Sequence, residues 1–251
     1  PLAVNAAAVD LNGWTAQGGS SSWNVQSGND TVLQTVNGNP TIFSDLSVTS
    51  TQGQALSGKI KVTTTGDDDF IGFVLGYDSG ELTSSASSAT SDFFLVDWKQ
   101  GDQGTAIDGL AISRVFGAST TFNNFWQHDG AVNEITRGTN LGSTGWLDNT
   151  EYSFDLLFTS SLIQVSVDSV LEISITPGDA GLSSFDDGSF GFYNYSQGNV
   201  LYSAITQVDC SQTPNAPGCQ QGGGTVPEPT SIALLGLGLA GLGLRRRRKA
   251  A

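Results

Sequence analysis

The amino-acid sequence predicts an all-β protein, built as a single β-sandwich of the jelly-roll or lectin-like kind. Apolar and polar residues alternate over 59–62 and 163–167, the period of a strand with one buried face. The stretches 70–77 and 93–98 are almost continuously apolar, which is typical of strands buried on both faces. The body of the sequence shows no clear 3.6-residue period, and about 190 residues with this many strands suit one sandwich.

Composition divides the chain into four segments. Residues 1–19 are small and polar, and we expect a loosely held lead-in or first strand there. The strand patterns fill 20–211, where clusters of Gly, Ser, Asn and Asp separate them. Residues 212–225 are rich in Pro, Gly, Gln and Asn, the composition of a flexible linker. Residues 226–251 hold an apolar run followed by basic residues, which predicts a single C-terminal hydrophobic helix.

Two local signals mark a turn and the end of the domain. Asp168 and Ser169 stand between two strand patterns and predict a tight hairpin turn. Cys210 and Cys219 lie close together near the end of the predicted sandwich. In an exported protein such a pair predicts a disulfide that closes a short loop, which contributes roughly 2–3 kcal/mol of stability.

The charge of the chain is strongly negative, with a formal net charge of −14. An acidic surface repels nucleic-acid phosphates, so we exclude nucleic acid as a partner. The same surface is compatible with binding divalent cations and with a soluble protein exposed outside the cell. The sequence has no Met and starts at Pro1, so we expect that a secretory signal peptide has been removed.

The last segment combines three kinds of chemistry in a fixed order. Pro227, Glu228 and Pro229 are followed by the apolar run 231–244 and then by the basic run 245–249. The apolar run gives roughly 21 Å of helix, a thin membrane span. The basic run is expected to stay in the cytoplasm, which places the body of the protein outside it.

This order resembles the PEP-CTERM sorting tail of Gram-negative bacteria that make exopolysaccharide. The resemblance implies an inner-membrane-tethered precursor, cleaved by an exosortase-type membrane protease and then sent to the cell surface or extracellular matrix. The alternative is a permanent C-terminal membrane anchor. The tail predicts where the protein is sent, but it does not indicate the function of the body.

The body resembles the thrombospondin C-terminal domain in several stretches that follow the order of that family. They are 32–40, 66–77 (GDDDFIGFVLGY), 93–100 (FFLVDWKQ), 109–114, 125–128, 145–152 (GWLDNTEY) and 188–197. The resemblance implies a lectin-like jelly roll, bound calcium, and adhesion or matrix interaction rather than catalysis. The Ser-rich insertion 78–92 departs from the family pattern and predicts a surface specific to this protein.

Three adjacent carboxylates, Asp67, Asp68 and Asp69, are the strongest candidate for a metal site. Calcium takes 6–8 oxygen ligands, and a cation relieves the repulsion between neighbouring carboxylates. Alternate side chains diverge on an extended backbone, so one ion would use Asp67 with Asp69, or one Asp with carbonyls. Asn37 or Asn39 is expected to contribute a further oxygen. The alternative is a solvated acidic turn before a strand.

Catalysis is not favoured by the residues of the body. His128 is the only histidine, and a hydrogen-bonded structural role beside Trp126 is favoured over a Ser-His-Asp triad. Glycosidases need two carboxylates about 5–10 Å apart, and the Glu-x-Asp-x-x-Glu pattern of the β-glucanase-like family does not occur here. We therefore expect a protein that is not an enzyme, with an Asp-based hydrolase pair as the remaining alternative.

Aromatic residues offer a possible glycan site. Trp126 and Trp146 lie in Gly- and Asn-rich surroundings and are candidates for sugar contacts, whereas Trp98 lies in a buried-looking run and is expected in the core. The sequence thus predicts an exported, calcium-binding, non-catalytic protein of adhesion or of the exopolysaccharide matrix. Its partners would be exopolysaccharide or surface proteins, the exosortase-type protease, and the membrane through the tail. A glycan-binding lectin is the alternative, followed by a polysaccharide hydrolase.

Overall fold

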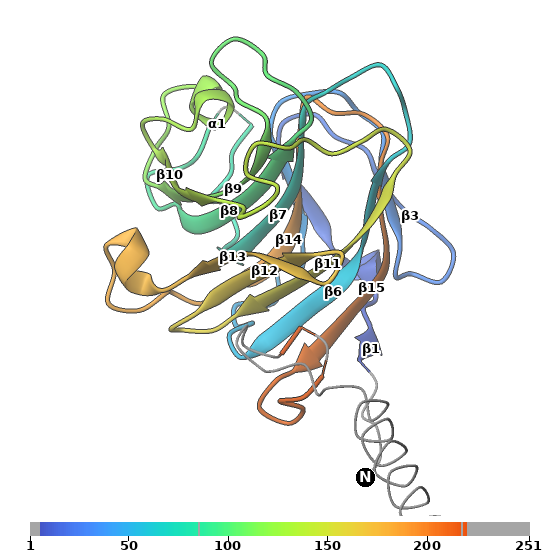
Figure 1. The fold of residues 1–251 in the computed structure, drawn as a ribbon, viewed down its shortest axis with the longest axis vertical. Helices are drawn as coiled ribbons and strands as arrows, with labels where there is room; N and C mark the ends of the chain where they lie inside the picture. The colour runs from blue at the N-terminus through green and yellow to red at the C-terminus, as the bar shows by residue number, and fades with distance from the viewer. Residues whose placement is uncertain (1–5, 85, 217, 220–251) are drawn as a thin grey trace, which may run out of the picture. The chain divides into compact units, whose positions relative to one another are not determined.

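The computed structural model describes residues 6–84, 86–216 and 218–219 and shows two antiparallel β-sheets packed face to face (Figure 1). The first sheet has the order β13 (Val170–Ile175), β12 (Ile163–Val167), β11 (Glu151–Phe158), β6 (Gln54–Val62), β15 (Val200–Asp209), β4 (Val32–Gln34) and β3 (Trp23–Val25), with β1 (Ala7–Ala8) paired to β15. The second has the order β10 (Val132–Arg137), β9 (Gly109–Phe116), β8 (Asp92–Lys99), β7 (Phe70–Tyr77), β14 (Ser189–Tyr195), β5 (Thr41–Ser44) and β2 (Thr15–Gly18). The predicted all-β sandwich is confirmed.

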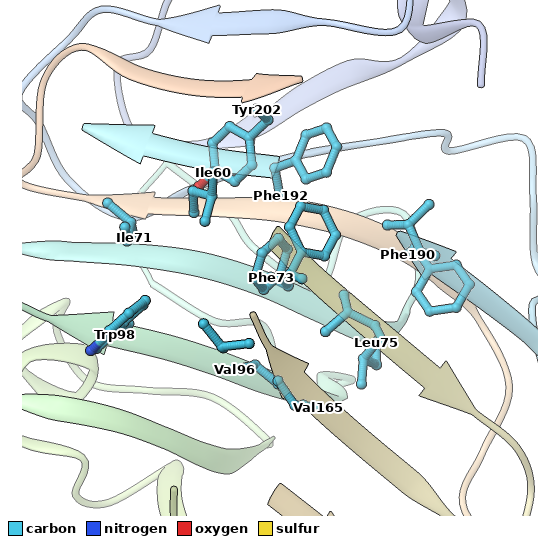
Figure 2. Packing of buried hydrophobic residues seen from close by; sticks show 14 of the residues in the cluster. Ile60, Ile71, Phe73, Leu75, Val96, Trp98, Val165, Phe190, Phe192 and Tyr202 are labelled. Carbon is cyan, nitrogen blue, oxygen red and sulfur yellow. The ribbon is translucent and has the colours of Figure 1, made fainter. Parts of the chain in front are cut away.

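The main hydrophobic core lies between the two sheets (Figure 2). Phe73 of β7 meets Phe154 of β11 with ring centroids 4.3 Å apart. Phe192 of β14 stacks on Tyr202 of β15 at 4.4 Å. Each such side chain contributes about 1.5–3 kcal/mol through burial, so aromatic contacts of this kind are a main source of the attraction between the sheets.

A second hydrophobic cluster covers the other face of the second sheet. The short helix α1 (Asn123–Gln127) supplies Phe125, which is fully buried against this face. All residues of β7 are buried, and so are those of β8 after Asp92. The prediction that these two runs are buried on both faces is confirmed, because α1 and the long loops around it exclude water from the outer side.

The predicted hairpin at Asp168 and Ser169 is confirmed. It joins β12 to β13, and both residues have positive φ angles, 48° and 66°. Two consecutive residues of this kind form the turn whose twist matches that of the strands. The Asp168 carboxylate also accepts a hydrogen bond of 2.8 Å from the backbone N–H of Ser153, which ties the turn to β11.

The Ser-rich insertion 78–92 folds back onto the protein. Leu82 is buried in the second cluster, and Glu81 is only 5% exposed. The Glu81 carboxylate accepts hydrogen bonds of 2.7 Å from the backbone N–H groups of Asp78 and Asp92. Burial raises the pKa of Glu81 to about 7 against the lowering effect of these bonds. The insertion is thus a closed loop anchored by a buried carboxyl group.

Within the lead-in, the described residues contain strands that pair with the sandwich, in line with the second of the two alternatives, a first strand. A 3₁₀ turn, η1 (Leu11–Gly13), places Leu11 in the main core, and β2 pairs with β5. Val9 and Trp14 also pack against this core, and Trp14 stacks on Phe192 with ring centroids 5.1 Å apart. A second 3₁₀ turn, η2 (Pro177–Ala180), follows β13.

The predicted disulfide between Cys210 and Cys219 is confirmed. The loop that it closes lies on the outer face of the first sheet, where Cys219 packs against Ala55 and Leu157. A side chain at Gly218 would contact Ala55 at 3.0 Å, so a glycine allows this close approach. The described residues of this disulfide loop are thus held against the sandwich by Cys219.

The remaining linker, the predicted C-terminal helix and the motif Pro227, Glu228 and Pro229 lie outside the described residues. Among the residues that are described, no helix has the length and apolar character needed to cross a membrane.

Candidate functional site

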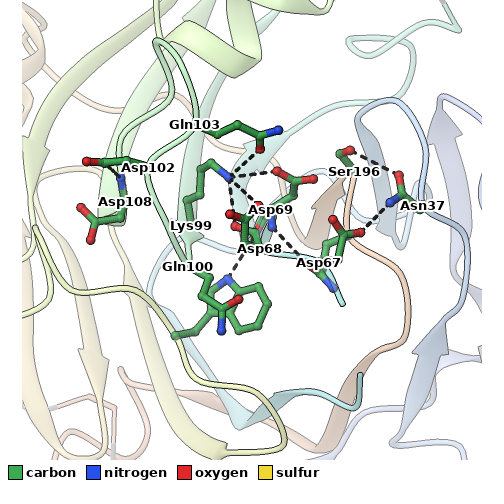
Figure 3. A network of polar contacts seen from close by, with 12 residues as sticks. Asn37, Asp67, Asp68, Asp69, Lys99, Gln100, Asp102, Gln103, Asp108 and Ser196 are labelled. Atoms are coloured by element: carbon green, nitrogen blue, oxygen red, sulfur yellow. Dashed lines mark hydrogen bonds and ion pairs between the residues drawn. The ribbon is translucent and has the colours of Figure 1, made fainter. Parts of the chain in front are cut away.

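The three predicted carboxylates lie in the loop between β6 and β7, and ligand oxygens of all three fall within 4.8 Å of one another (Figure 3). The loop is held at its inner end, where Asp69 is 4% exposed. The N–H group of Asp69 donates to Oε1 of Gln197 at 3.0 Å. Its carbonyl accepts from Nε1 of Trp146 at 3.1 Å. Both anchors are distant in sequence, so the fold fixes the position of the acidic loop.

A buried lysine that sequence reasoning missed partly neutralises the cluster (Figure 3). Nζ of Lys99 lies 2.9 Å from Oδ1 of Asp69 and 3.3 Å from Oδ1 of Asp68, and its side chain has no exposed surface. The ammonium also lies 5.5 Å and 5.0 Å from the ring centroids of Phe70 and Trp126. A signal was present in the sequence, because Lys99 directly follows the run 93–98, which was predicted to be buried on both faces.

Asp67 occupies the outer side of the cluster. Nδ2 of Asn37 donates to its carboxylate at 2.5 Å, and Oδ1 of Asn37 accepts from the Ser196 hydroxyl at 3.2 Å. Burial, and then the negative charge of Asp69, raise the pKa of Asp67 to about 6. The ligand oxygens of Asp67 and Asp69 lie within 4.8 Å of each other, so the two carboxylates repel when both are ionised. At neutral pH a cation would relieve the same repulsion.

The predicted asparagines have different positions. Asn37 contacts the cluster through Asp67, as the sequence predicted for one of the two. Asn39 is exposed, and none of the contacts found in the described part of the chain links it to the carboxylates. Both asparagines are exposed, so burial does not separate them; the hydrogen bond to Asp67 does.

The residues present fit a calcium ion. Oxygens that share one calcium at roughly 2.3–2.6 Å lie at most about 5 Å apart, and the cluster meets this condition. Lys99 already holds one oxygen each of Asp68 and Asp69. The carboxylate of Asp67 and the second oxygen of Asp68 would hold the ion together with water. Asn37 would add its amide oxygen by turning the amide, whose nitrogen faces Asp67 in this structure.

Two other acidic groups hold backbone turns. The Asp187 carboxylate accepts hydrogen bonds from the N–H groups of Thr51 and Gln52 at 2.9 Å and 3.0 Å, and with Ser50 these bonds overcome the effect of burial and lower its pKa. Asp102 accepts from the N–H of Asp108 at 2.9 Å. Carboxylates engaged in this way stabilise backbone turns.

His128 is held by hydrogen bonds, as predicted. Its Nε2 lies 2.9 Å from Asp97 and its Nδ1 lies 3.0 Å from Glu134. Burial lowers the pKa of His128, but the two carboxylates outweigh it and raise the pKa to about 10. Burial raises the pKa of Glu134, but hydrogen bonds from His128 and Arg137 lower it to about 2. His128 and Glu134 are thus held in one hydrogen-bonded network, which is the structural role predicted for the histidine.

The structure separates the two tryptophans proposed for glycan contact. Trp146 is 1% exposed and has no face available to a sugar, so this prediction is wrong. The adjacent Gly145 explains the error: a Cβ atom there would collide with the carbonyl of Gln100, so the glycine marks a close backbone approach and not an exposed loop. Trp126 is half-buried and lines a cleft.

This opening, which we call the Trp126 cleft, has a volume of about 250 Å³. Its walls come from three places: Thr105 and Ile107 from the loop between β8 and β9, Trp126 and Gln127 from α1, and Glu134 and Arg137 from β10. Phe70 and His128 complete the lining. Phe70 is also one of the rings beneath Lys99, so the cleft and the acidic cluster share a wall.

Comparison with known proteins identifies two parts of the chain. Residues 19–212 match the thrombospondin C-terminal region, and residues 225–248 match the PEP-CTERM protein-sorting motif. Human thrombospondin-3 is 28% identical over 210 residues, which cover 76% of this chain and 20% of that protein. Zebrafish thrombospondin-4-B is 24% identical over 208 residues, with the same coverage. The chain therefore spans about a fifth of the length of these relatives.

Solved structures share the fold at low sequence identity. The carbohydrate-binding module CBM66 of Bacillus subtilis superimposes with a TM-score of 0.53 and 13% identity, covering 78% of this chain and 94% of the module. The exoplasmic/lumenal domain of VIP36, in a form bound to Ca²⁺ and Man2, gives a TM-score of 0.53 and 13% identity, covering 78% of this chain and 81% of that one. They support the lectin-like sandwich predicted from the sequence.

The motifs quoted from the sequence, the two-sheet fold and the match over 19–212 agree with one another. The matched region includes the acidic cluster, Lys99 and the Trp126 cleft. The protein therefore belongs to the thrombospondin C-terminal region family and carries a PEP-CTERM sorting motif behind that domain.

Proposed function

We propose that this chain is an exported surface protein whose lectin-like sandwich binds calcium and acts, without catalysis, in adhesion or in the exopolysaccharide matrix. The sorting motif at 225–248 supports export and processing by an exosortase-type protease. In this proposal the precursor is tethered in the inner membrane of a Gram-negative bacterium, and the mature protein reaches the surface or matrix. Its partners there are polysaccharide or other surface proteins.

The contact between Asp67 and Asp69 carries the calcium proposal. Carboxylates whose oxygens lie within 4.8 Å of one another repel each other when both are ionised, and this repulsion adds to burial in raising the pKa of Asp67. Lys99 compensates Asp69 and Asp68 from the inner side only. A divalent cation on the outer side would relieve this repulsion, and Asn37 would offer it an amide oxygen if the amide turned.

Family membership supports the same proposal, because the thrombospondin resemblance implies bound calcium and matrix interaction. The calcium sites of this chain need not equal those of the thrombospondins in affinity or number, since the chain corresponds to a fifth of the length of those proteins. The charge of −14 also favours association with divalent cations over association with anionic polymers directly. An acidic matrix polymer would then be reached through shared calcium ions.

The test is the melting temperature of the full chain in millimolar calcium and again in excess EDTA. A ligand that binds only the folded state at a hundredfold excess over its Kd adds about 2.7 kcal/mol, which raises the melting temperature of a domain of this size by several degrees. Magnesium is the control ion, because it requires a tighter octahedral site. Equal melting temperatures in calcium and EDTA would contradict the metal site.

A glycan-binding lectin is the second candidate, and the Trp126 cleft favours it. The cleft combines a half-buried tryptophan with exposed polar side chains. CBM66 is a carbohydrate-binding module, and the VIP36 domain was solved with Man2, so sandwiches of this shape present sugar sites. Retention of the protein on an insoluble polysaccharide, with no release of reducing ends over time, would separate a lectin from a hydrolase.

A further inference from the structure

We propose, building on the glycan-binding alternative above, that the Trp126 cleft binds an uncharged sugar unit of a glycan. Four features of the described residues support this assignment: an aromatic wall, exposed hydrogen-bonding groups, charges that are already paired, and a rigid frame.

The apolar wall is formed by Trp126 and Ile107. Trp126 makes edge contacts with Phe70 and Tyr195, each with ring centroids 5.5 Å apart, so the indole is held in one orientation. Ile107 lines the same cleft and is 51% exposed. The C–H face of a sugar ring packs on an apolar surface of this kind, and its burial is the main source of affinity.

The polar side of the cleft suits hydroxyl groups. The Thr105 hydroxyl and the Gln127 amide are exposed at its edge and can both donate and accept hydrogen bonds. The Glu134 carboxylate, which is partly exposed, can accept bonds from sugar hydroxyls. Donors and acceptors therefore surround the apolar wall, as a ring of hydroxyls around a sugar requires.

The charged residues of the cleft are paired with one another. Nε of Arg137 donates to Glu134 at 3.0 Å, and its Nη1 donates to the carbonyl of Gly142 at 2.8 Å. His128 lies between Glu134 and the buried Asp97. An anionic sugar would have to break these pairs to obtain a counter-charge, which is costly in a partly buried site. The arrangement therefore selects an uncharged ligand.

The frame of the cleft is preorganised. Phe125 anchors α1 in the second hydrophobic cluster, and the two hydrogen bonds of His128 fix the residue that ends the helix. A rigid site loses little conformational entropy on binding. The volume of about 250 Å³ is below the roughly 300–1,000 Å³ of drug-sized pockets, so the cleft takes one or two sugar rings while the rest of the glycan lies outside.

The test is calorimetric titration of the full chain with cellotetraose and mannotetraose as uncharged probes. Tetragalacturonate is the charged probe, and an apolar tripeptide represents a protein ligand. We expect millimolar binding of at least one uncharged probe, and binding about tenfold weaker in Trp126→Ala, which corresponds to about 1.4 kcal/mol. Since Trp126 also packs inside the protein, the double variant Thr105→Ala with Gln127→Ala provides an independent test at exposed positions and should weaken binding about threefold or more.

The matched control is Phe116→Ala, which removes a 61% exposed aromatic ring outside the cleft and should leave binding unchanged. Failure of both uncharged probes at millimolar concentrations would overturn the proposal. Equal binding by wild type, Trp126→Ala and the double variant would do so as well, as would a preference for tetragalacturonate or the tripeptide. Each titration is run in calcium and in EDTA. A calcium-dependent melting shift without sugar binding removes the cleft proposal alone, and sugar binding without that shift removes the calcium proposal alone.

Discussion

Nζ of Lys99 lies 2.9 Å from Oδ1 of Asp69, and the two side chains are 0% and 6% exposed. The acidic loop thus contains its own cation, placed by the pairing of β7 with β8, in which Phe70 lies opposite Lys99. This ammonium compensates the inner carboxylates and leaves Asp67 as the group with a raised pKa. The interior of the loop is therefore structural, and its outer side is where a metal ion could bind.

Removing the buried cation should destabilise the protein strongly. In Lys99→Met the side chain keeps its volume but leaves the carboxylate of Asp69 buried without its partner, which costs about 3–5 kcal/mol. Urea unfolding at pH 7 measures the loss. The control is Lys59→Met, because Lys59 and Glu151 form a pair whose side chains are 49% and 43% exposed, worth about 1 kcal/mol or less. Similar losses for both variants would show that the buried pair has no special role.

Asp67→Asn should have opposite effects with and without calcium. The folded state raises the pKa of Asp67 to about 6, so its ionised form opposes folding at pH 7. Removing the charge should stabilise the calcium-free protein by about 1 kcal/mol, after allowance for solvent screening. The same change replaces a charged ligand by a neutral amide oxygen and should reduce the calcium-induced rise in melting temperature. The control Asp168→Asn changes a distant hairpin turn, and a reduced calcium response there would contradict this assignment.

The calcium-free protein should lose stability as the pH rises from about 4 to 7. Asp67 and Glu81 have ordinary pKa values of 3.8 and 4.5, which the fold raises to about 6 and about 7. The folded state therefore binds protons more tightly in this range, and its advantage disappears as the pH passes the raised values. Urea unfolding in EDTA across this pH range measures how the free energy of unfolding changes with pH. Glu81→Gln should flatten its upper part, whereas the exposed Glu151→Gln should not; a slope unchanged by Glu81→Gln would contradict the role of the buried carboxyl.

The strand patterns predicted the sandwich because periodicity reports burial directly. The alternation in β6 and β12, the apolar runs of β7 and β8, and the turn at Asp168 all depend on neighbours in sequence. The disulfide could be predicted for the same reason, since its two cysteines lie 9 residues apart. Local signals of this kind do not depend on contacts between segments that are distant in sequence.

The site could be predicted only in part because its contacts join distant segments. The triple Asp was visible as a motif, but Lys99 reaches it through the β7–β8 register, 30 residues away. Trp146 was misread because a glycine neighbour indicates either an exposed loop or a close backbone approach, and here the carbonyl of Gln100 decides for the second. The cleft beside Trp126 depends on α1, a helix too short to produce a periodic pattern.

Replacement of His128 should remove a contribution to the free energy of unfolding that the wild type itself loses as the pH becomes alkaline. Its pKa is about 10 in the folded protein against an ordinary 6.5, so the pair with Asp97 contributes fully below pH 6.5 and is lost as the pH rises toward 10. His128→Asn suits the left-handed backbone, where φ is 50°, but is too short to bridge Asp97 and Glu134. It should cost about 3–5 kcal/mol at pH 7, because Asp97 is then a buried charge without its partner. Between pH 7 and 10 the free energy of unfolding of the wild type, measured in urea, should fall toward that of the variant. The control Lys59→Met should show the same fall as the wild type. A gap that stays constant over this range would mean that His128 acts by packing and not by its charge.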